Sequence, residues 1–147
     1  MEIIDKLNAS TQAILPYFDL SSEDLLRTYA PGKWTIKQIL VHLSDAESVM
    51  LYRIRKVICE PGQVIWAFNQ DVWCEKLRYT DYPIMLSKSE FLSNRQSIQY
   101  LAKLHYATSA ELHFVHSETG LRTLKNEFDK IVAHSEGHLS QIKNALL

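Results

Sequence analysis

The sequence predicts an all-α protein, a four-helix bundle made by one domain over residues 1–147. Glycine and proline are scarce, with four of each, and they occur at a few places only, so they divide the chain into long uninterrupted segments. Within these segments apolar residues recur every three or four positions, which is the helical period. A chain of 147 residues with 46% apolar residues can bury the core of such a bundle.

The first two long helices are predicted in the N-terminal part of the chain. Apolar residues spaced for one helical face run over residues 2–17, and Pro16 interrupts them near the end. The stretch SSEDLLRTYA has a serine cap followed by acids, which predicts a short helical turn. Thr35 is a natural N-cap for the second long helix, and Pro61-Gly62 ends that helix.

Two more long helices are predicted behind longer connections, one after the second helix and one after the third. Residues 61–86 are less regular and contain FNQDVWCEKLRY, which could form a short helix. The third long helix is expected to begin near Ser87 or Ser89. Residues 106–123 are expected to form a connection with short turns, and the last helix is expected to begin near Thr123. We expect no strand pairing.

Composition and charge exclude several classes of protein. The formal net charge is −1, so the chain lacks the basic surface of proteins that bind nucleic acids or anionic membranes. No apolar run reaches the ~18 residues of a membrane span, and the stretch MEIIDKLNAS lacks the features of a signal peptide. The spacing of Cys59 and Cys74 is not that of a disulfide framework. We expect both to be reduced and packed as small apolar residues, in a cytoplasmic protein.

The stretch IVAHSEGHLSQI, residues 131–142, places two histidines on a helical face that turns toward the core. His134 and His138 are four residues apart, so they are neighbours on that face. Two charged imidazoles there would repel each other and lose hydration, whereas a divalent cation takes neutral imidazoles as ligands. His42, in the middle of the second helix, is the best candidate for a third ligand. Three protein ligands with one open position are typical of catalytic zinc sites.

Other interpretations of the histidines stay open at this point. The same side chains could be packed and satisfied by hydrogen bonds to their neighbours. A metalloprotease motif has Glu directly after the first His, whereas Glu136 is two residues after His134 and is turned away from that face. A di-iron bundle needs inward Glu-x-x-His pairs, which this sequence lacks. We expect His105 and His113 to lie at the surface or to be satisfied by their neighbours, and we leave the place of His116 open.

Five further residues are candidates for the pocket of this site or for the layer of side chains behind it. They are Asp45, Tyr52, Asn69, Trp73 and His116. Asp45 follows His42 by about one turn and could orient that histidine, although a solvated helix face is the favoured interpretation. Trp73 falls in the irregular segment, where a bundle would build the rim of a pocket, and Tyr52 is a second candidate wall.

Two motifs resemble those of a known family, the DinB-like superfamily. The stretch PGKWTIKQILVHLSDAE is similar to the family's opening motif, a Trp, a Ser or Thr, an apolar run and His-Leu followed by acids. The stretch IVAHSEGHLSQI is similar to the closing motif, two histidines four apart followed by Leu-x-Gln-Ile. FNQDVWCEKLRY and HSETGLRTL resemble segments of one branch of the family. The likeness covers residues 31–147, and Asn69 departs from it because an acid is often found at that place.

The resemblance implies a four-helix bundle that binds a divalent metal through His42, His134 and His138, and it implies frequent homodimers. Some members of the family are thiol S-transferases, and others are metal-dependent hydrolases or isomerases. We therefore expect a metal-dependent enzyme with Zn²⁺ or Ni²⁺, which transfers a low-molecular-weight thiol to an electrophilic small molecule. Hydrolysis of a small molecule is one alternative, and a non-catalytic metal-binding or stress-response dimer is another. Gly137, between the two histidines, is expected to keep its turn thin so that another helix can approach.

Overall fold

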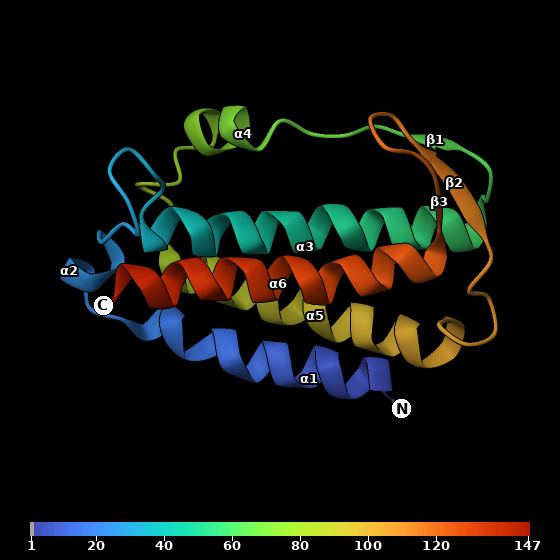
Figure 1. The fold of residues 1–147 in the computed structure, drawn as a ribbon, viewed down its shortest axis with the longest axis horizontal. Coiled ribbons are helices and arrows are strands. Elements are labelled where there is room, and N and C mark those ends of the chain that lie inside the picture. Colours follow the sequence, from blue (N-terminus) through green and yellow to red (C-terminus); the bar gives the residue numbers. More distant parts are fainter. Residues whose placement is uncertain (1) are drawn as a thin grey trace.

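Four long helices lie side by side in the computed structural model, which describes residues 2–147 (Figure 1). They are α1 (Glu2–Ile14), α3 (Ile36–Cys59), α5 (Ile84–His105) and α6 (Leu124–Ala145). Helix α3 packs against α5 and α6, and α1 packs against the same two helices from the opposite side. The predicted four-helix bundle is confirmed, and the longer connections do follow the second and the third long helices.

The ends of the two helices that carry the histidines are set by local sequence. Thr35 caps α3 through a capping box with Gln38, in which each side chain accepts a hydrogen bond from the other residue's backbone N–H. Helix α6 begins in the same way, with Thr123 as its cap and Asn126 as the reciprocal partner. Thr35 is the predicted cap, and α6 begins near Thr123 as predicted. The capping boxes give each helix a defined start, which fixes where along it the histidines lie.

The shorter helical segments form where they are predicted, whereas the third long helix begins earlier than predicted. Helix α1 ends at Ile14 and a 3-10 helix follows (Leu15–Asp19), with Pro16 in its first turn. The short helices α2 (Ser22–Leu25) and α4 (Gln70–Lys76) form where the sequence predicts them. The expected start of the third long helix near Ser87 or Ser89 was wrong, because the helix already begins after Pro83. Proline fixes its own φ and needs no N–H, so it serves at a helix start without a side-chain cap.

A small three-stranded sheet was not predicted. Its strands are β1 (Val64–Ile65), β2 (His113–His116) and β3 (Gly120–Thr123), in the order β1-β2-β3, and β1 pairs with β2 in parallel while β2 and β3 form an antiparallel hairpin. The expectation of no strand pairing was wrong because strands of two to four residues are too short to show a clear alternation of apolar and polar residues. The hairpin of β2 and β3 leads directly into α6, beside the C-terminal end of α3 (Figure 1).

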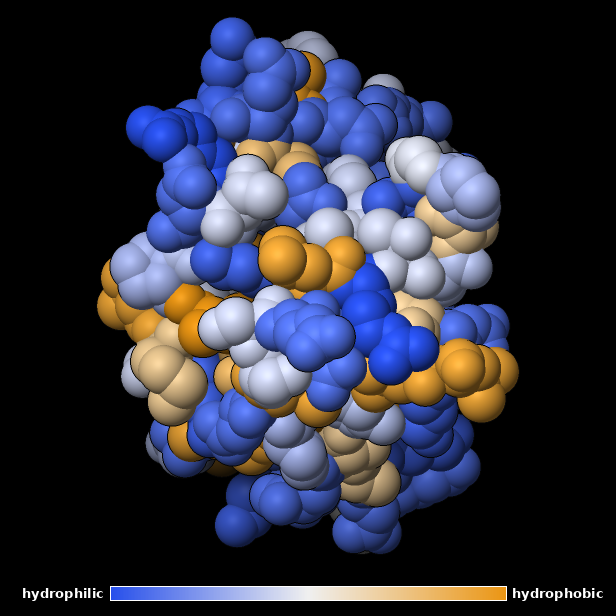
Figure 2. All heavy atoms as spheres, turned by 90° about the vertical axis from the view of Figure 1, so that its left-hand side faces the viewer, coloured by the Kyte–Doolittle hydropathy of each residue, from blue (hydrophilic) through white to orange (hydrophobic). Residues whose placement is uncertain are grey.

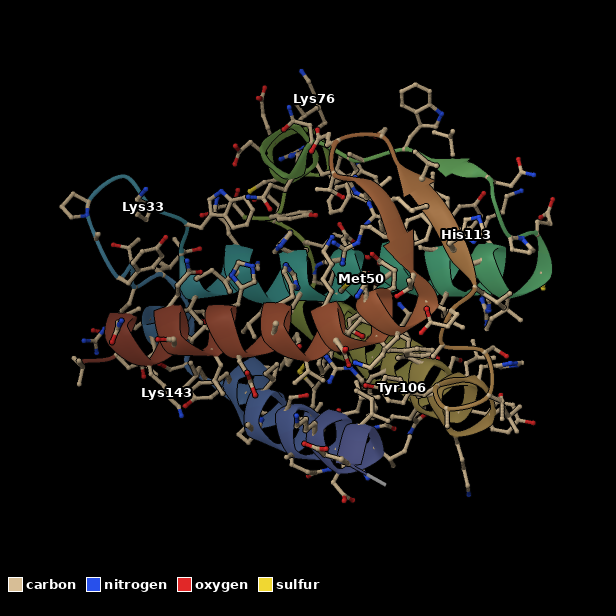
Figure 3. All side chains as sticks on the ribbon, turned by 45° about the vertical axis from the view of Figure 1, so that its right-hand side comes forward. Lys33, Met50, Lys76, Tyr106, His113 and Lys143 are labelled. Atoms are coloured by element: carbon tan, nitrogen blue, oxygen red, sulfur yellow. The ribbon has the colours of Figure 1, made fainter. Side chains whose placement is uncertain are left out.

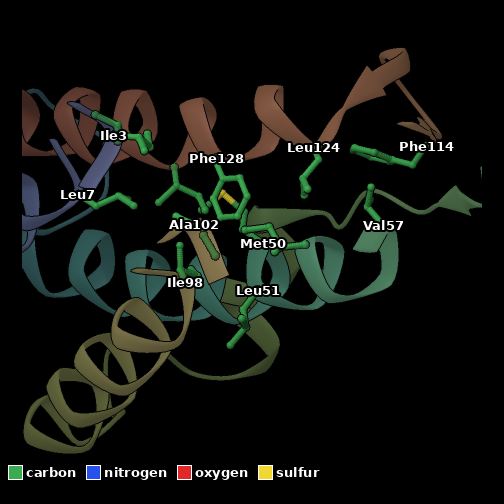
Figure 4. Close-up of a cluster of buried hydrophobic side chains, with 14 of the residues drawn as sticks. Ile3, Leu7, Met50, Leu51, Val57, Ile98, Ala102, Phe114, Leu124 and Phe128 are labelled. Carbon is green, nitrogen blue, oxygen red and sulfur yellow. The ribbon is translucent and has the colours of Figure 1, made fainter. Parts of the chain in front are cut away.

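The hydrophobic core fills the space between the four helices along their length. In its larger cluster, side chains such as Leu7, Met50, Ile98 and Phe128 come from all four long helices, and Phe114 of the hairpin extends the cluster under the sheet (Figure 4). The surface at the end of the bundle near α2 is mostly hydrophilic, with apolar side chains in separate small groups (Figure 2). Among residues 2–147 no helix is long and apolar enough to cross a membrane.

One buried arginine joins all four long helices. Arg95 of α5 is fully buried and donates to both carboxylate oxygens of Glu47 on α3, at 2.5 and 3.0 Å. It also donates to Ser10 and Thr11 of α1, at 2.8 and 3.1 Å, and to Ser135 of α6, at 2.7 Å. Because every helix supplies a partner, this network fixes the positions of the four helices relative to one another.

Candidate metal centre

Three histidine side chains meet between α3 and α6. His42 comes from α3, and His134 and His138 come from successive turns of α6. The Nε2 atom of His134 lies 3.0 Å from Nε2 of His42 and 3.2 Å from Nε2 of His138. The three residues each offer one ring nitrogen within 4.8 Å of the others, which is a group that could hold a metal ion. The three nitrogens therefore converge on one point.

Burial keeps these histidines neutral. The His42 side chain is almost wholly buried, and His134 and His138 are partly buried. Burial, together with the neighbouring histidine His138, lowers the pKa of His42 and of His134 to about 3. Burial also lowers the pKa of His138, against an opposing hydrogen bond to Gln141. At neutral pH all three rings are therefore in the uncharged form that binds metals.

The protons of the three rings cannot satisfy the contacts among them. A neutral imidazole has one N–H and one lone pair. His138 Nδ1 lies 2.8 Å from the Gln141 side-chain oxygen, an acceptor, so the proton is on Nδ1 and Nε2 presents its lone pair to His134. If His134 Nε2 carries a proton, that proton can point at only one of its two neighbours; if it carries none, it meets the lone pair of His138. In either case one of the two short contacts has no hydrogen bond, whereas a cation could accept a lone pair from each of the three nitrogens.

An aromatic wall closes one side of the cluster. The Trp34 ring centroid lies 5.0 Å from that of His42, and the Phe68 centroid lies 6.4 Å from it. Trp73 packs on Phe68 with a centroid distance of 4.7 Å. These rings shield the buried imidazoles from solvent on the side of α4.

Two hollows reach the cluster from different directions. One of about 320 Å³ is lined by His138, Gln141 and Trp34 among others. The second, of about 230 Å³, is lined by His42 and His134 together with residues of α3, α6 and the hairpin loop. A larger hollow of about 540 Å³ lies between α1, α6 and the end of α5 and has none of the three histidines in its walls.

The sequence as a whole matches one family. The sequence profile of the DinB superfamily matches residues 6–142. The chain belongs to the DinB superfamily. The match includes all three histidines and most of the four long helices, so the histidine cluster lies inside the family's shared region.

Curated relatives and a solved structure resemble this DinB protein over most of its length. A protein of Oceanobacillus iheyensis named "Putative metal-dependent hydrolase OB0413" is 28% identical over 127 residues, which are 86% of this chain and 73% of the relative. A "Putative metal-dependent hydrolase" of Bacillus cereus is 27% identical over 142 residues, 96% of this chain and 79% of the relative. YfiT from Bacillus subtilis, described as "a probable metal-dependent hydrolase with an unusual four-helix bundle topology", superimposes with a TM-score of 0.88 at 20% identity, over 97% of this chain and 82% of the other, and shows the same fold.

Two residues predicted near the site of this DinB protein have structural partners of their own. Asp45 accepts a hydrogen bond from the Tyr79 hydroxyl and makes no hydrogen bond to His42, whose Nδ1 has no partner among residues 2–147. Asn69 is the N-cap of α4, where its side-chain oxygen accepts from the N–H groups of the second and third residues after it, both at 3.1 Å. The capping role accounts for an amide at position 69, since Asn is among the best N-cap residues.

Of the other residues predicted near the site, the fold brings some to the histidine cluster and leaves others away from it. Trp73 stands behind Phe68 in the aromatic wall, and His116 lines the hollow beside His42 and His134. Tyr52 is 59% exposed and lines a separate hollow near β1. Gly137 is exposed, and a Cβ atom added there would meet nothing within 4 Å, so the expectation that it lets another helix approach closely was wrong.

The cysteines are both free, as expected, although only one is packed. Cys74 is buried and Cys59, at the end of α3, is exposed, so the expectation of two buried thiols was half wrong.

Sequence reasoning missed the charged residues beside the histidines. Arg53 on α3 and Lys130 on α6 line the same hollow as His42 and His134. The one available signal was the position of Lys130, four residues before His134 on the same helical face.

Proposed function

We propose that the chain is a metal-dependent enzyme that binds one divalent cation through His42, His134 and His138 and hydrolyses a small molecule. The convergence of the three Nε2 atoms carries the proposal, since no distribution of protons satisfies their contacts. The names of the curated relatives, which describe metal-dependent hydrolases, agree with it. The likeness to YfiT supports the fold on which it depends.

Zn²⁺ and Ni²⁺ are the cations that we propose, because neutral imidazole nitrogens suit both. A bound cation with three protein ligands would have an open position, where it lowers the pKa of a water molecule or a thiol. The chain would supply orientation and exclusion of solvent. Gln141 holds the proton of His138 on Nδ1 and so directs Nε2 to the centre. Trp34 and Phe68 keep bulk water away from His42.

Transfer of a low-molecular-weight thiol to an electrophile is the second candidate function. The two hollows that reach the histidines from different directions favour it, because a transfer needs room for two molecules. Gln70 lines both hollows, so the two spaces adjoin. Hydrolysis needs only one such space besides water, and the names of the relatives favour hydrolysis.

The first experiment is to measure the metal content of protein purified without an affinity tag. We expect about one Zn²⁺ or Ni²⁺ per chain and none in the His138→Ala variant. A metal-free protein that stays metal-free in the presence of Zn²⁺, Ni²⁺ or Co²⁺ would contradict the proposal and favour a bundle whose histidines are merely packed. Bound metal without turnover of any ester, amide or electrophile tested would favour the non-catalytic metal-binding protein instead.

Cobalt substitution separates hydrolysis from thiol transfer. Thiolate coordination to Co²⁺ gives a charge-transfer band in the near ultraviolet, and a thiol that binds at the centre should produce that band and release a proton. A band that appears with a cellular thiol and is absent in His42→Ala supports transfer. No spectral response to any common thiol favours hydrolysis over transfer. A homodimer, which the family resemblance implies, stays a prediction that light scattering can test.

A further inference from the structure

The hollow of about 230 Å³ beside the histidines has cationic and hydrogen-bond-donating walls. His42 and His134 form the end of this hollow, which we call the hairpin cavity, and Arg53, Lys130 and His116 line it further along. Met50 of α3, labelled in Figure 3, also lines it, and in that view the hairpin crosses over this part of α3. The cavity therefore leads from the hairpin loop to the proposed metal centre.

Arg53 is a buried side chain of the cavity whose guanidinium has no hydrogen-bond partner among the described residues. It is 2% exposed. Its one ion-pair contact is to Glu127, with 3.9 Å between Arg53 Nη1 and Glu127 Oε2, too far for a hydrogen bond. Glu127 is already paired with Arg122, whose Nε lies 3.2 Å from its other oxygen. A buried guanidinium normally has its N–H groups occupied, so Arg53 lacks the partners that its burial requires.

Lys130 and His116 add two more donors without partners. Lys130 is half-buried one turn before His134, and its amine makes no hydrogen bond or ion pair within residues 2–147. Burial lowers the pKa of Lys130, chiefly by loss of hydration. His116 Nδ1 accepts from the backbone N–H groups of Glu118 and Thr119, at 3.1 and 3.2 Å, so the proton of the neutral ring is on Nε2. That Nε2–H group makes no hydrogen bond within the described chain.

The charges around the cavity sum to an excess of one cation. Arg53, Arg122 and Lys130 are positive and Glu118 and Glu127 are negative, and the other four charges all act on the pKa of Lys130. Glu118 is exposed at the rim, and Glu127 is fully buried between the two arginines. A divalent cation on the histidines would add to the excess. An anion inside the cavity would find three donors and a net positive field.

We propose that the hairpin cavity is an anion-binding subsite in which Arg53, Lys130 and His116 receive a carboxylate or phosphate group of the substrate. The link to a substrate rests on the proposed function, because it is the metal centre that makes the cavity's inner end reactive. A small anionic molecule would place its charged group under the hairpin and its reactive group toward His42 and His134. The subsite itself is formed by residues that bind no metal, so it can be tested separately.

The test is a titration of isotope-labelled protein with inorganic phosphate and with acetate at constant ionic strength, followed by nuclear magnetic resonance. Metal-free protein and Zn²⁺-loaded protein are titrated in parallel. We expect saturable shifts of the backbone amides of Glu118 and Thr119 in both forms, since these groups hold His116 in place. The anion that binds more tightly identifies the charged group of the substrate as phosphate or carboxylate.

Two lysines of α6 provide the variant and its matched control. Lys130→Met removes a cavity donor and should weaken binding about tenfold, the effect of a charge-assisted hydrogen bond. Lys130→Arg should restore most of the binding. Lys143→Met removes the same charge from the exposed end of α6, where Lys143 projects away from the bundle (Figure 3), and should change nothing.

Three outcomes would overturn the subsite. They are no saturable shift in either form, equal weakening by Lys130→Met and Lys143→Met, and binding that needs Zn²⁺ and ignores Lys130→Met, which would place the anion on the metal alone. Arg53→Lys tests the second donor with its charge retained and should weaken phosphate binding several-fold. If the protein binds no metal at all, the metal-free titration still measures anion binding in the hairpin cavity. A failure of the proposed metal-dependent function can therefore be told apart from a failure of the proposed anion subsite.

Discussion

Two buried polar clusters lie next to each other in this bundle and are completed in opposite ways. In the Arg95 cluster, five side-chain hydrogen bonds join Arg95 to acceptors on the other three long helices. In the histidine cluster, two short contacts join ring nitrogens that cannot all be paired, and Nδ1 of His42 and of His134 have no partner within the described residues. The clusters adjoin at His134 and Ser135, which are consecutive in the sequence.

The difference teaches which polar groups the chain buries for stability and which it buries for binding. A fully paired network in a low-dielectric interior holds its elements in one arrangement. A cluster of neutral donors and lone pairs that lacks its last partner costs stability until that partner arrives. We therefore expect the Arg95 cluster to respond to mutation by loss of stability and the histidine cluster to respond by loss of metal.

Arg95→Met should have the largest effect on folding. It leaves Glu47 fully buried without its cationic partner and removes the donors that join Ser10, Thr11 and Ser135. Breaking a buried pair in this way costs ~3–5 kcal/mol of unfolding free energy. Urea denaturation followed by circular dichroism measures the loss. Lys103→Met, at an exposed position of the same helix, is the matched control and should stay within ~0.5 kcal/mol of the native protein.

The double variant Glu47→Met with Arg95→Met sharpens that result. Because the second change removes the unpaired charge, the double variant should lose less stability than Arg95→Met alone. A double variant whose loss equals the sum of the two single losses would show that Glu47 and Arg95 do not act as a pair.

Metal removal should have the next largest effect. A cation that binds only the folded protein stabilises it by about 2.7 kcal/mol at a free concentration of 100 times its Kd. Thermal unfolding in the presence and absence of a chelator should therefore show a lower Tm for the chelated native protein. The Tm of His42→Ala should not respond to the chelator. A native protein whose Tm ignores both Zn²⁺ and chelator would leave the histidine cluster without the role that we propose for it.

His138→Ala should separate binding from folding. The variant keeps two ligands, so its affinity for the cation should fall steeply, whereas its metal-free stability should change by no more than ~1 kcal/mol because the side chain is only partly buried. Isothermal titration calorimetry with Zn²⁺ and urea denaturation measure the two effects. His105→Ala, at the end of α5 and outside the cluster, should bind Zn²⁺ as the native protein does. Unchanged affinity in His138→Ala would remove His138 from the proposed ligand set.

The histidine cluster was open to prediction from the sequence, whereas the Arg95 cluster and the hairpin cavity were not. The spacing of His134 and His138 predicts a shared helical face by itself, and two capping threonines locate the helices that carry the histidines. Arg95 and Arg53 look like ordinary charges on amphipathic helices. Their burial is decided by packing partners far away in the sequence, such as Glu47 for Arg95, at a separation of 48 residues.

The strands were missed for a related reason. The long helix α5 lies between β1 and β2 in the sequence and brings the two strands together. Their pairing Val64–Val115 spans about a third of the chain. The local sequence of a two-residue strand carries no signal that predicts such a distant pairing partner. Because the hairpin covers the cavity beside His134, the misassigned connection also hid the environment of Arg53, Lys130 and His116. Local periodicity thus located the helices and the histidines, and the charged surroundings followed only from the tertiary structure.

The smallest effect concerns pH, where we expect the metal affinity to stay nearly constant from about pH 7.5 to about pH 5.5. Exposed histidines titrate near ~6.5, so a surface site would lose metal over this range. Burial lowers the pKa of His42 and of His134 to about 3, so protons do not compete with the cation there. Calorimetric titrations with Zn²⁺ in a series of buffers measure the affinity, and an unstructured peptide with two histidines four apart serves as the reference that should lose its metal.

The same pKa shift fixes how the metal is finally lost. In the unfolded chain these histidines bind protons below pH ~6.5, whereas in the folded protein His42 and His134 do so only near 3, so the unfolded state binds more protons in between. The stability that this difference contributes is present above the unfolded pKa and is lost as the pH falls toward the folded one. Metal release on acidification should therefore coincide with unfolding, seen as a joint loss of bound Zn²⁺ and of helical circular dichroism. Release near pH ~6.5 from protein that stays folded would mean that the imidazoles titrate as solvated groups, and the contrast between the two clusters would then be one of location alone.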